Sequence, residues 1–180
     1  CLPMSQAMSP EEAQIIRQFV QSGGTVIADV RPGIFDGHLK AMPAGLLDDV
    51  FGIKRQGRGK AQQAEVSLQG VLGATPLDMK LQTRIDPDVR ANGARALGAV
   101  GDVPVGLVNQ FGKGQAVLLN FQLMTAKEED QQAADMRQLL AALYRFGKTQ
   151  PPVGVASPEG APLPATETRV WRDGDALVFG

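Results

Sequence analysis

Cys1 and His38 are the only cysteine and the only histidine of the chain, and these two residue types can together carry out nucleophilic catalysis. A thiolate attacks acyl groups well, and an adjacent imidazole generates it by accepting the thiol proton. Such a mechanism requires the two side chains to meet within hydrogen-bonding reach, and a variant of it would use Asp29 in place of Cys1. We favour a structural interpretation, in which Cys1 ends a strand and His38 lies in a polar loop.

Four aspartates lie close together in the first part of the chain: Asp29, Asp36, Asp48 and Asp49. Two carboxylates about 5 to 10 Å apart can hydrolyse a glycosidic bond, one as the acid and the other as the nucleophile or base. The sequence fixes no such pair, because Asp48 and Asp49 are neighbours on a predicted short helix and therefore point apart. We expect no catalysis by these acids.

A short basic run is interleaved with glycines and contains Lys54, Arg55, Arg58 and Lys60. The run includes no aromatic residue that would stack on a base, and the net charge of the whole chain is −1. Neither this run nor Gly112-Lys113-Gly114 has the spacing of a phosphate-binding loop. We therefore predict a solvated loop and a turn at these positions, and no nucleic-acid partner.

The clearest local signal is a helix that begins after Ser9. Ser9 is a favourable N-cap, Pro10 suits the first helical position, and Glu12 completes a capping box. Gly23-Gly24 ends the helix. Its predicted apolar face contains Ile15, Ile16, Phe19 and Val20.

A short β-branched strand is predicted over residues 25–30, and the loop at residues 31–39 follows it. Open α/β sheets bind ligands beyond the carboxyl ends of their strands. Arg31, Phe35 and His38 are therefore the candidate contacts for a sugar or for a partner domain. The equally simple alternative is that this loop only folds over its own sheet.

The rest of the chain is predicted to alternate between strands and helices. The acidic residues at 128–130 are predicted to stabilise the N-terminus of a helix through its dipole, and this role is favoured over metal binding. Neither a metal nor a cofactor is expected. The predicted strands cover residues 64–68, 79–84, 94–100, 103–108 and 115–121, and the predicted helices cover residues 43–51 and 128–146.

Three regions are expected along the chain. An α/β domain over residues 1–150 precedes a linker rich in proline and alanine over residues 151–167. Strands at residues 168–171 and 176–179 then flank Asp173-Gly174 and begin a β-rich module over residues 168–180. Because both ends of the chain look like interrupted strands, we expect a segment of a longer polypeptide.

Several segments recur in the same order and spacing in a known family. They are residues 2–3 (Leu-Pro), 9–13 (Ser-Pro-Glu-Glu-Ala), 19–25 (Phe-Val-Gln-Ser-Gly-Gly-Thr), 45–52 (Gly-Leu-Leu-Asp-Asp-Val-Phe-Gly), 107–109 (Leu-Val-Asn), 111–114 (Phe-Gly-Lys-Gly) and 116–121 (Ala-Val-Leu-Leu-Asn-Phe). Together they resemble the glutamine-amidotransferase-like middle domain, or trimerisation domain, of glycoside hydrolase family 42 β-galactosidases.

The resemblance implies a flavodoxin-like or class I glutamine-amidotransferase-like three-layer α/β sandwich that lacks its first strands. It places the amidotransferase elbow near residues 29–33, where this chain has no cysteine. It therefore implies a non-catalytic domain that contributes to trimer contacts, meets neighbouring domains of its own chain, and approaches a sugar site. The catalytic glutamates of that family lie in a preceding barrel domain.

Other classes of function stay open at this point. The chain has no apolar run long enough to span a membrane, and its single cysteine favours the cytoplasm without excluding secretion. The alternatives are an amidotransferase-like or small-molecule enzyme that uses Cys1 and His38, and an interaction module of a larger membrane-linked assembly.

Overall fold

A computed structural model describes residues 1–123, 131–149, 155–161, 163 and 169–179 of the chain. The chain divides into two compact units, Cys1–Gly147 and Lys148–Gly180. The expected acidic helix start at residues 128–130 and most of the expected linker at residues 151–167 lie outside the described residues.

Helix α1 spans Pro10–Gln21 and begins with the predicted capping box. The Glu12 amide donates to Ser9 Oγ at 3.2 Å, and the Ser9 amide donates to Glu12 Oε2 at 2.7 Å. The predicted apolar face is wrong in part, because Ile15 and Phe19 are 66% and 54% exposed. Within α1 only Ala13 and Val20 are buried, so the buried face of this helix is narrow.

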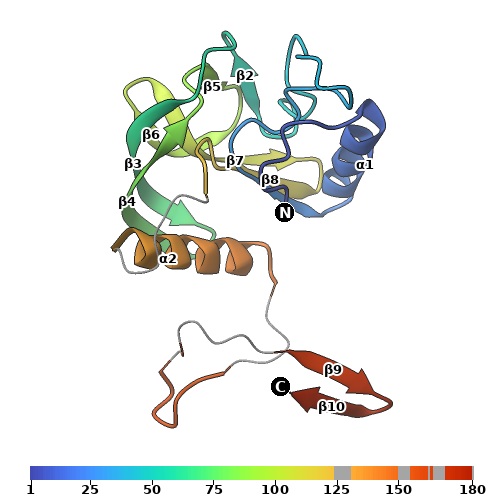
Figure 1. The fold of residues 1–180 in the computed structure, drawn as a ribbon, viewed down its shortest axis with the longest axis vertical. Coiled ribbons are helices and arrows are strands. Elements are labelled where there is room, and N and C mark those ends of the chain that lie inside the picture. Colours follow the sequence, from blue (N-terminus) through green and yellow to red (C-terminus); the bar gives the residue numbers. More distant parts are fainter. Residues whose placement is uncertain (124–130, 150–154, 162, 164–168, 180) are drawn as a thin grey trace. The chain divides into compact units, whose positions relative to one another are not determined.

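A four-stranded mixed sheet forms the centre of the first unit (Figure 1). Its order is β1 (Thr25–Ala28), β8 (Gly114–Leu118), β7 (Val103–Phe111) and β6 (Arg95–Val100). Strand β1 runs parallel to β8, whereas the other neighbours are antiparallel. Leu2 forms an isolated parallel bridge with Ala28, which places the first residues beside β1.

Helix α1 packs against β1 and β8 through a close backbone approach. A Cβ atom at Gly114 would collide with the carbonyl oxygens of Val20 and Gly24, so only glycine fits at this position. The predicted glycine-lysine-glycine turn between β7 and β8 therefore also sets how closely the helix approaches the sheet.

A long hairpin and a short pair of strands that are distant in sequence complete the strands of the first unit. The long hairpin pairs β3 (Gln62–Leu72) with β4 (Thr75–Ile85), and alternate residues of β4 are buried from Leu77 to Ile85. Helix α2 (Gln131–Phe146) packs on this hairpin (Figure 1). The short pair joins β2 (Ile53–Arg55) to β5 (Val89–Ala91) in antiparallel register.

The predicted helix over residues 43–51 is wrong. These residues form consecutive bends and turns, although Leu47, Val50 and Phe51 are fully buried as their spacing suggested. The carboxylate of Asp48 accepts a hydrogen bond from the Gly45 amide at 2.9 Å, and such a local side-chain bond competes with helix formation.

The second unit contains a β-hairpin of β9 (Val170–Asp173) and β10 (Ala176–Phe179). Gly174 has a φ of 58° at its turn, which agrees with the predicted Asp-Gly turn. Among the described helices of both units, none is long and apolar enough to cross a membrane.

Candidate functional site

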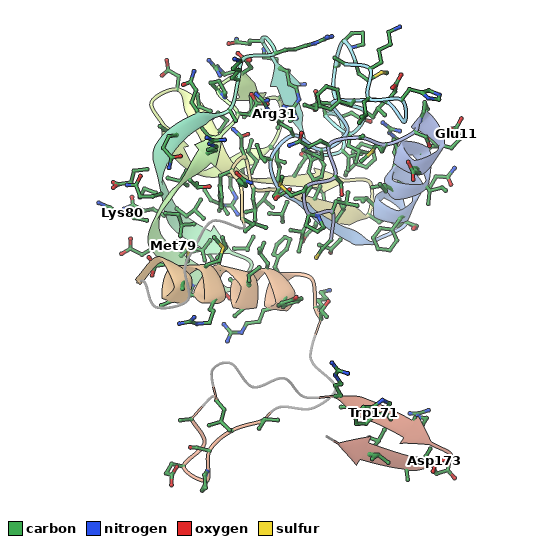
Figure 2. The ribbon with its side chains drawn as sticks, viewed as in Figure 1. Glu11, Arg31, Met79, Lys80, Trp171 and Asp173 are labelled. Carbon is green, nitrogen blue, oxygen red and sulfur yellow. The ribbon has the colours of Figure 1, made fainter. Side chains whose placement is uncertain are left out.

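Arg31 lies just beyond the carboxyl end of β1 and has a left-handed backbone, with a φ of 64°. This conformation costs a non-glycine residue on the order of 1 kcal/mol and is common at functional sites. Figure 2 shows Arg31 close to β2, at the end of the first unit opposite α2. The turn at Arg31 falls where the family resemblance implied the amidotransferase elbow, but turns and bends follow it instead of a helix.

The side chain of Arg31 connects two loops that are distant in sequence. Its Nε lies 3.2 Å from Oδ2 of Asp86, the residue that follows β4. Its Nη2 donates to the carbonyl oxygen of Gly59. The loop after β1 is therefore tied to the turn after β4 and to the glycine-rich run after β2.

Arg55 occupies the last position of β2 and contacts two aspartates. Its Nη1 donates to Asp86 Oδ2 at 2.5 Å, and its Nε donates to Asp48 Oδ1 at 3.1 Å. The side chains of Arg55, Asp86 and Asp48 are only 7%, 5% and 10% exposed. We call Arg31, Arg55, Asp48 and Asp86 the arginine–aspartate cluster.

Burial dominates the electrostatics of Asp48 and raises the pKa of its carboxyl group. The charge of Arg55 and the hydrogen bond from the Gly45 amide oppose that rise. Removing one partner of a buried pair leaves an uncompensated charge, so the members of this cluster depend on one another.

A cavity of about 210 Å³ lies against this cluster. Arg31, Arg55 and Asp86 provide its charged wall, and Arg58 also lines it. The rest of its lining is mainly apolar and comes from Ile34, Phe35, Ala41, Met42, Pro43, Ala44, Gly45 and Gly57.

Backbone hydrogen bonds hold the loop that forms the apolar wall. The Phe35 amide donates to the carbonyl oxygen of Gln6 at 3.0 Å, and the Met42 amide donates to that of Ile34 at 2.9 Å. Both alternatives for the 31–39 loop are therefore compatible with the structure, because the loop folds against its own unit and still lines a cavity.

The structure brings together two of the three predicted contact residues. Arg31 and Phe35 line the cavity, whereas His38 is exposed and is not part of its lining. The amides of His38 and Lys40 both donate to Asp36 Oδ1 at 2.9 Å, so the segment around His38 is a tight local turn.

Cys1 and His38 belong to different parts of the surface. Cys1 lines a second cavity of about 200 Å³ together with Asp29, Leu123 and residues of α2. The hydrogen bonds between described residues include none that joins Cys1 to His38. The geometry thus gives no support to a nucleophile and base made of this pair.

Asp29 is buried in the wall of the second cavity, and burial raises the pKa of its carboxyl group. Its Oδ1 accepts a hydrogen bond from the Met4 amide at 2.6 Å, while its Oδ2 has no partner. Within the described part of the chain, no group of three or more His, Cys, Asp or Glu residues is placed to hold a metal.

Sequence reasoning missed the roles of Arg55 and Asp86. The basic run was predicted to be solvated, which is correct for Lys54, Arg58 and Lys60 but wrong for Arg55. Arg55 ends a strand and lies two residues after the apolar Ile53, so the two side chains share a face of the strand. This spacing was the available signal that the side chain of Arg55 is buried. Asp86 was not among the predicted site residues, because its partners are distant in sequence.

Comparisons with known proteins identify the fold. No protein-family model and no curated protein sequence matches the chain. Among solved structures, the β-galactosidase from Rahnella sp. R3 is 24% identical, with a TM-score of 0.70 over 98% of this chain and 26% of that one. The β-galactosidase from Bacillus circulans sp. alkalophilus is 21% identical, with a TM-score of 0.66 over 96% of this chain and 25% of that one.

A third neighbour is Gan42B, a GH42 β-galactosidase from G. stearothermophilus. It is 20% identical, with a TM-score of 0.59 over 83% of this chain and 21% of that one. The chain therefore spans about a quarter of the β-galactosidase chains that it matches. The resemblance is confirmed at the level of fold: this chain is similar to a single domain of the larger GH42 β-galactosidases.

Proposed function

We propose that this chain is a non-catalytic α/β domain of a larger carbohydrate-active enzyme of the β-galactosidase type, where it contributes to subunit assembly or shapes the active site. The fold match carries this proposal, because nearly the whole chain aligns with only a quarter of a β-galactosidase. Hydrolysis of galactosides would then rest with other parts of the polypeptide.

The chemistry of the first cavity supports a non-catalytic role. A carboxylate that acts as nucleophile or base needs an oxygen free to reach the substrate. Both oxygens of Asp86 and both oxygens of Asp48 already accept hydrogen bonds from the protein. These acids are therefore suited to hold Arg31 and Arg55 in place.

One surface of the first unit is suited to shaping an active site, and another is suited to subunit assembly. The loop that carries Phe35 would shape a neighbouring site, because its backbone is fixed by hydrogen bonds and its side chains border a cavity. On α1, Ile15 and Phe19 are one helical turn apart and largely exposed, so a contact with another subunit would remove apolar surface from water.

Light scattering and galactoside hydrolysis, measured together on the natural polypeptide that carries this chain, test the proposal. Ile15→Lys places a charge on the apolar face of α1, and Gln63→Lys places the same charge on exposed strand β3 as a control. Phe35→Ala removes the aromatic side chain from the cavity wall.

An assembly role predicts a smaller particle for Ile15→Lys and an unchanged particle for Gln63→Lys. An active-site role predicts an unchanged particle but a higher KM for Phe35→Ala. The proposal is overturned if neither the particle mass nor the hydrolysis of galactosides responds to Ile15→Lys or Phe35→Ala.

A further inference from the structure

The first cavity contains more cationic donors than acceptors to satisfy them. Arg55 Nη2 is buried and has no hydrogen-bond acceptor. Arg58 is exposed, lines the cavity, and has no ion-pair partner among the residues that the structure describes. Arg31, Arg55 and Arg58 outnumber the one aspartate of the lining, Asp86, so the charge of the wall favours an anion that enters this cavity.

The acidic oxygens around the cavity are already occupied. Asp86 Oδ1 accepts from the Asp88 amide at 3.1 Å and lies 3.4 Å from Arg31 Nη2. Asp86 Oδ2 accepts from Arg55 Nη1. The lining therefore offers unpaired positive groups without an unpaired carboxylate, and a complementary ligand must bring its own negatively charged oxygen.

The apolar wall and the volume of the cavity determine the polarity and the size of the rest of the ligand. Ile34, Phe35, Met42 and Pro43 supply a surface that favours an apolar body. Drug-sized pockets enclose roughly 300–1,000 Å³, whereas an apolar cavity of about 150 Å³ holds a benzene ring. The cavity of about 210 Å³ is thus matched to a single small ring with one attached charged group.

We propose that this cavity binds a small monocarboxylate with a compact apolar body, with the carboxylate toward Arg58 and the body against Phe35 and Met42. A guanidinium can bind a carboxylate through two parallel hydrogen bonds, which explains the preference for this anion over a spherical one. The proposal does not rest on the proposed function, because it needs only the cavity and its unpaired donors.

Benzoate is a suitable probe, and its binding to the natural full-length protein is measured by ligand-observed NMR titration. Benzyl alcohol has a similar size and no charge, and inorganic phosphate has the charge without the apolar body. We expect benzoate to bind about tenfold more tightly than either, because each lacks one of the two contributions.

Arg58→Gln is the decisive variant, since Arg58 is exposed and its loss leaves the buried cluster intact. It should weaken benzoate binding about tenfold through the lost charge-assisted contact. Lys60→Gln removes the same charge from an exposed residue of the same loop that does not line the cavity, and it should leave binding unchanged. Phe35→Ala should weaken benzoate binding and leave phosphate binding unchanged.

The proposal is overturned if benzoate does not bind, if Arg58→Gln binds it as tightly as the natural protein, or if benzyl alcohol binds equally well. Phosphate that binds as tightly as benzoate would also overturn it, because the apolar wall would then contribute nothing. Particle mass and galactoside hydrolysis are separate readouts, so failure here leaves the assembly and active-site proposal to its own test.

Discussion

Arg55 Nη1 donates to Asp86 Oδ2 at 2.5 Å, and this contact joins the end of β2 to the turn after β4. The two side chains are 7% and 5% exposed, so water screens their interaction weakly. Asp86 also lies 3.2 Å from Arg31 Nε, which makes one carboxylate the partner of two guanidinium groups. The geometry of the first cavity therefore depends on Asp86.

Replacing Asp86 with asparagine is expected to destabilise the protein by about 3–5 kcal/mol, because the buried Arg55 side chain and the partly buried Arg31 side chain lose their shared counter-charge. The free energy of unfolding in urea measures this effect. Asp102→Asn, at an exposed position in the turn between β6 and β7, is the control and should change stability by less than about 0.5 kcal/mol. Equal stability of the two variants would show that Asp86 does not hold the cluster together.

Gly45 is expected to tolerate no side chain, because a Cβ atom there would overlap the carboxylate of Asp48. Gly45→Ala forces that carboxylate away from the Gly45 amide and from Arg55, at a cost of about 1–3 kcal/mol in the free energy of unfolding. Gly37→Ala is the matched control in the preceding loop, since nothing lies within 4 Å of a Cβ atom at Gly37. A stable Gly45→Ala protein would contradict the tight turn at residues 45–48.

Gly174 and Gly45 illustrate how much of the fold the sequence alone predicts. The capping box of α1 and the turn at Gly174 are local, and each was predicted from residues that are adjacent or one helical turn apart. The segment that contains Gly45 has helical spacing of its apolar residues, yet the bond from the Gly45 amide to Asp48 favours turns. A periodic pattern predicts which side chains are buried, but it does not decide how the backbone buries them.

The candidate site shows this limit of prediction from sequence more strongly than the backbone does. Arg31 was predicted because it follows a strand, whereas Arg55 gains its role only through Asp48 and Asp86. Asp86 meets Arg55 because the long β3–β4 hairpin lies between them in the sequence and returns the chain to β2, and no local signal in the sequence specifies that meeting. Sequence reasoning therefore found the loop of the site and missed the charges that support it.

Asp29→Asn is expected to raise stability at neutral pH. Burial raises the pKa of Asp29 in the folded state, so the unfolded state ionises first and stability falls as pH rises from the ordinary aspartate pKa of about 3.9 toward the folded pKa. Asparagine retains an oxygen for the Met4 amide but cannot ionise. The urea midpoint of the variant should exceed that of the natural protein at pH 7.

The comparison at low pH checks the cause of that gain. At pH 3 Asp29 is protonated in both states, so the difference in urea midpoint between the natural protein and Asp29→Asn should disappear. Asp78→Asn, at an exposed position of β4, is the control and should show no pH-dependent gain. A gain that persists at pH 3 would assign the effect to packing instead of ionisation.

Arg17 connects α1 to the turn segment that borders the first cavity. Its Nε and Nη2 donate to the two carboxylate oxygens of Asp49 at 2.9 and 2.8 Å, and Nη2 also donates to the carbonyl oxygen of Leu46 at 2.9 Å. Burial opposes ionisation of Asp49, but the hydrogen bond and charge of Arg17 outweigh it and lower the pKa of Asp49.

Arg17→Gln is expected to cost about 0.5–1 kcal/mol at pH 7, a small value because the Asp49 side chain is 52% exposed and water screens the pair. A lowered folded pKa means that the stabilisation is present above the ordinary aspartate pKa and is lost as pH falls through the folded value. The difference in free energy of unfolding between the natural protein and Arg17→Gln should therefore shrink below about pH 4. Gln18→Ala, at an exposed neighbour on α1, should show no such pH dependence, and a cost for Arg17→Gln that is constant with pH would assign it to the Leu46 contact alone.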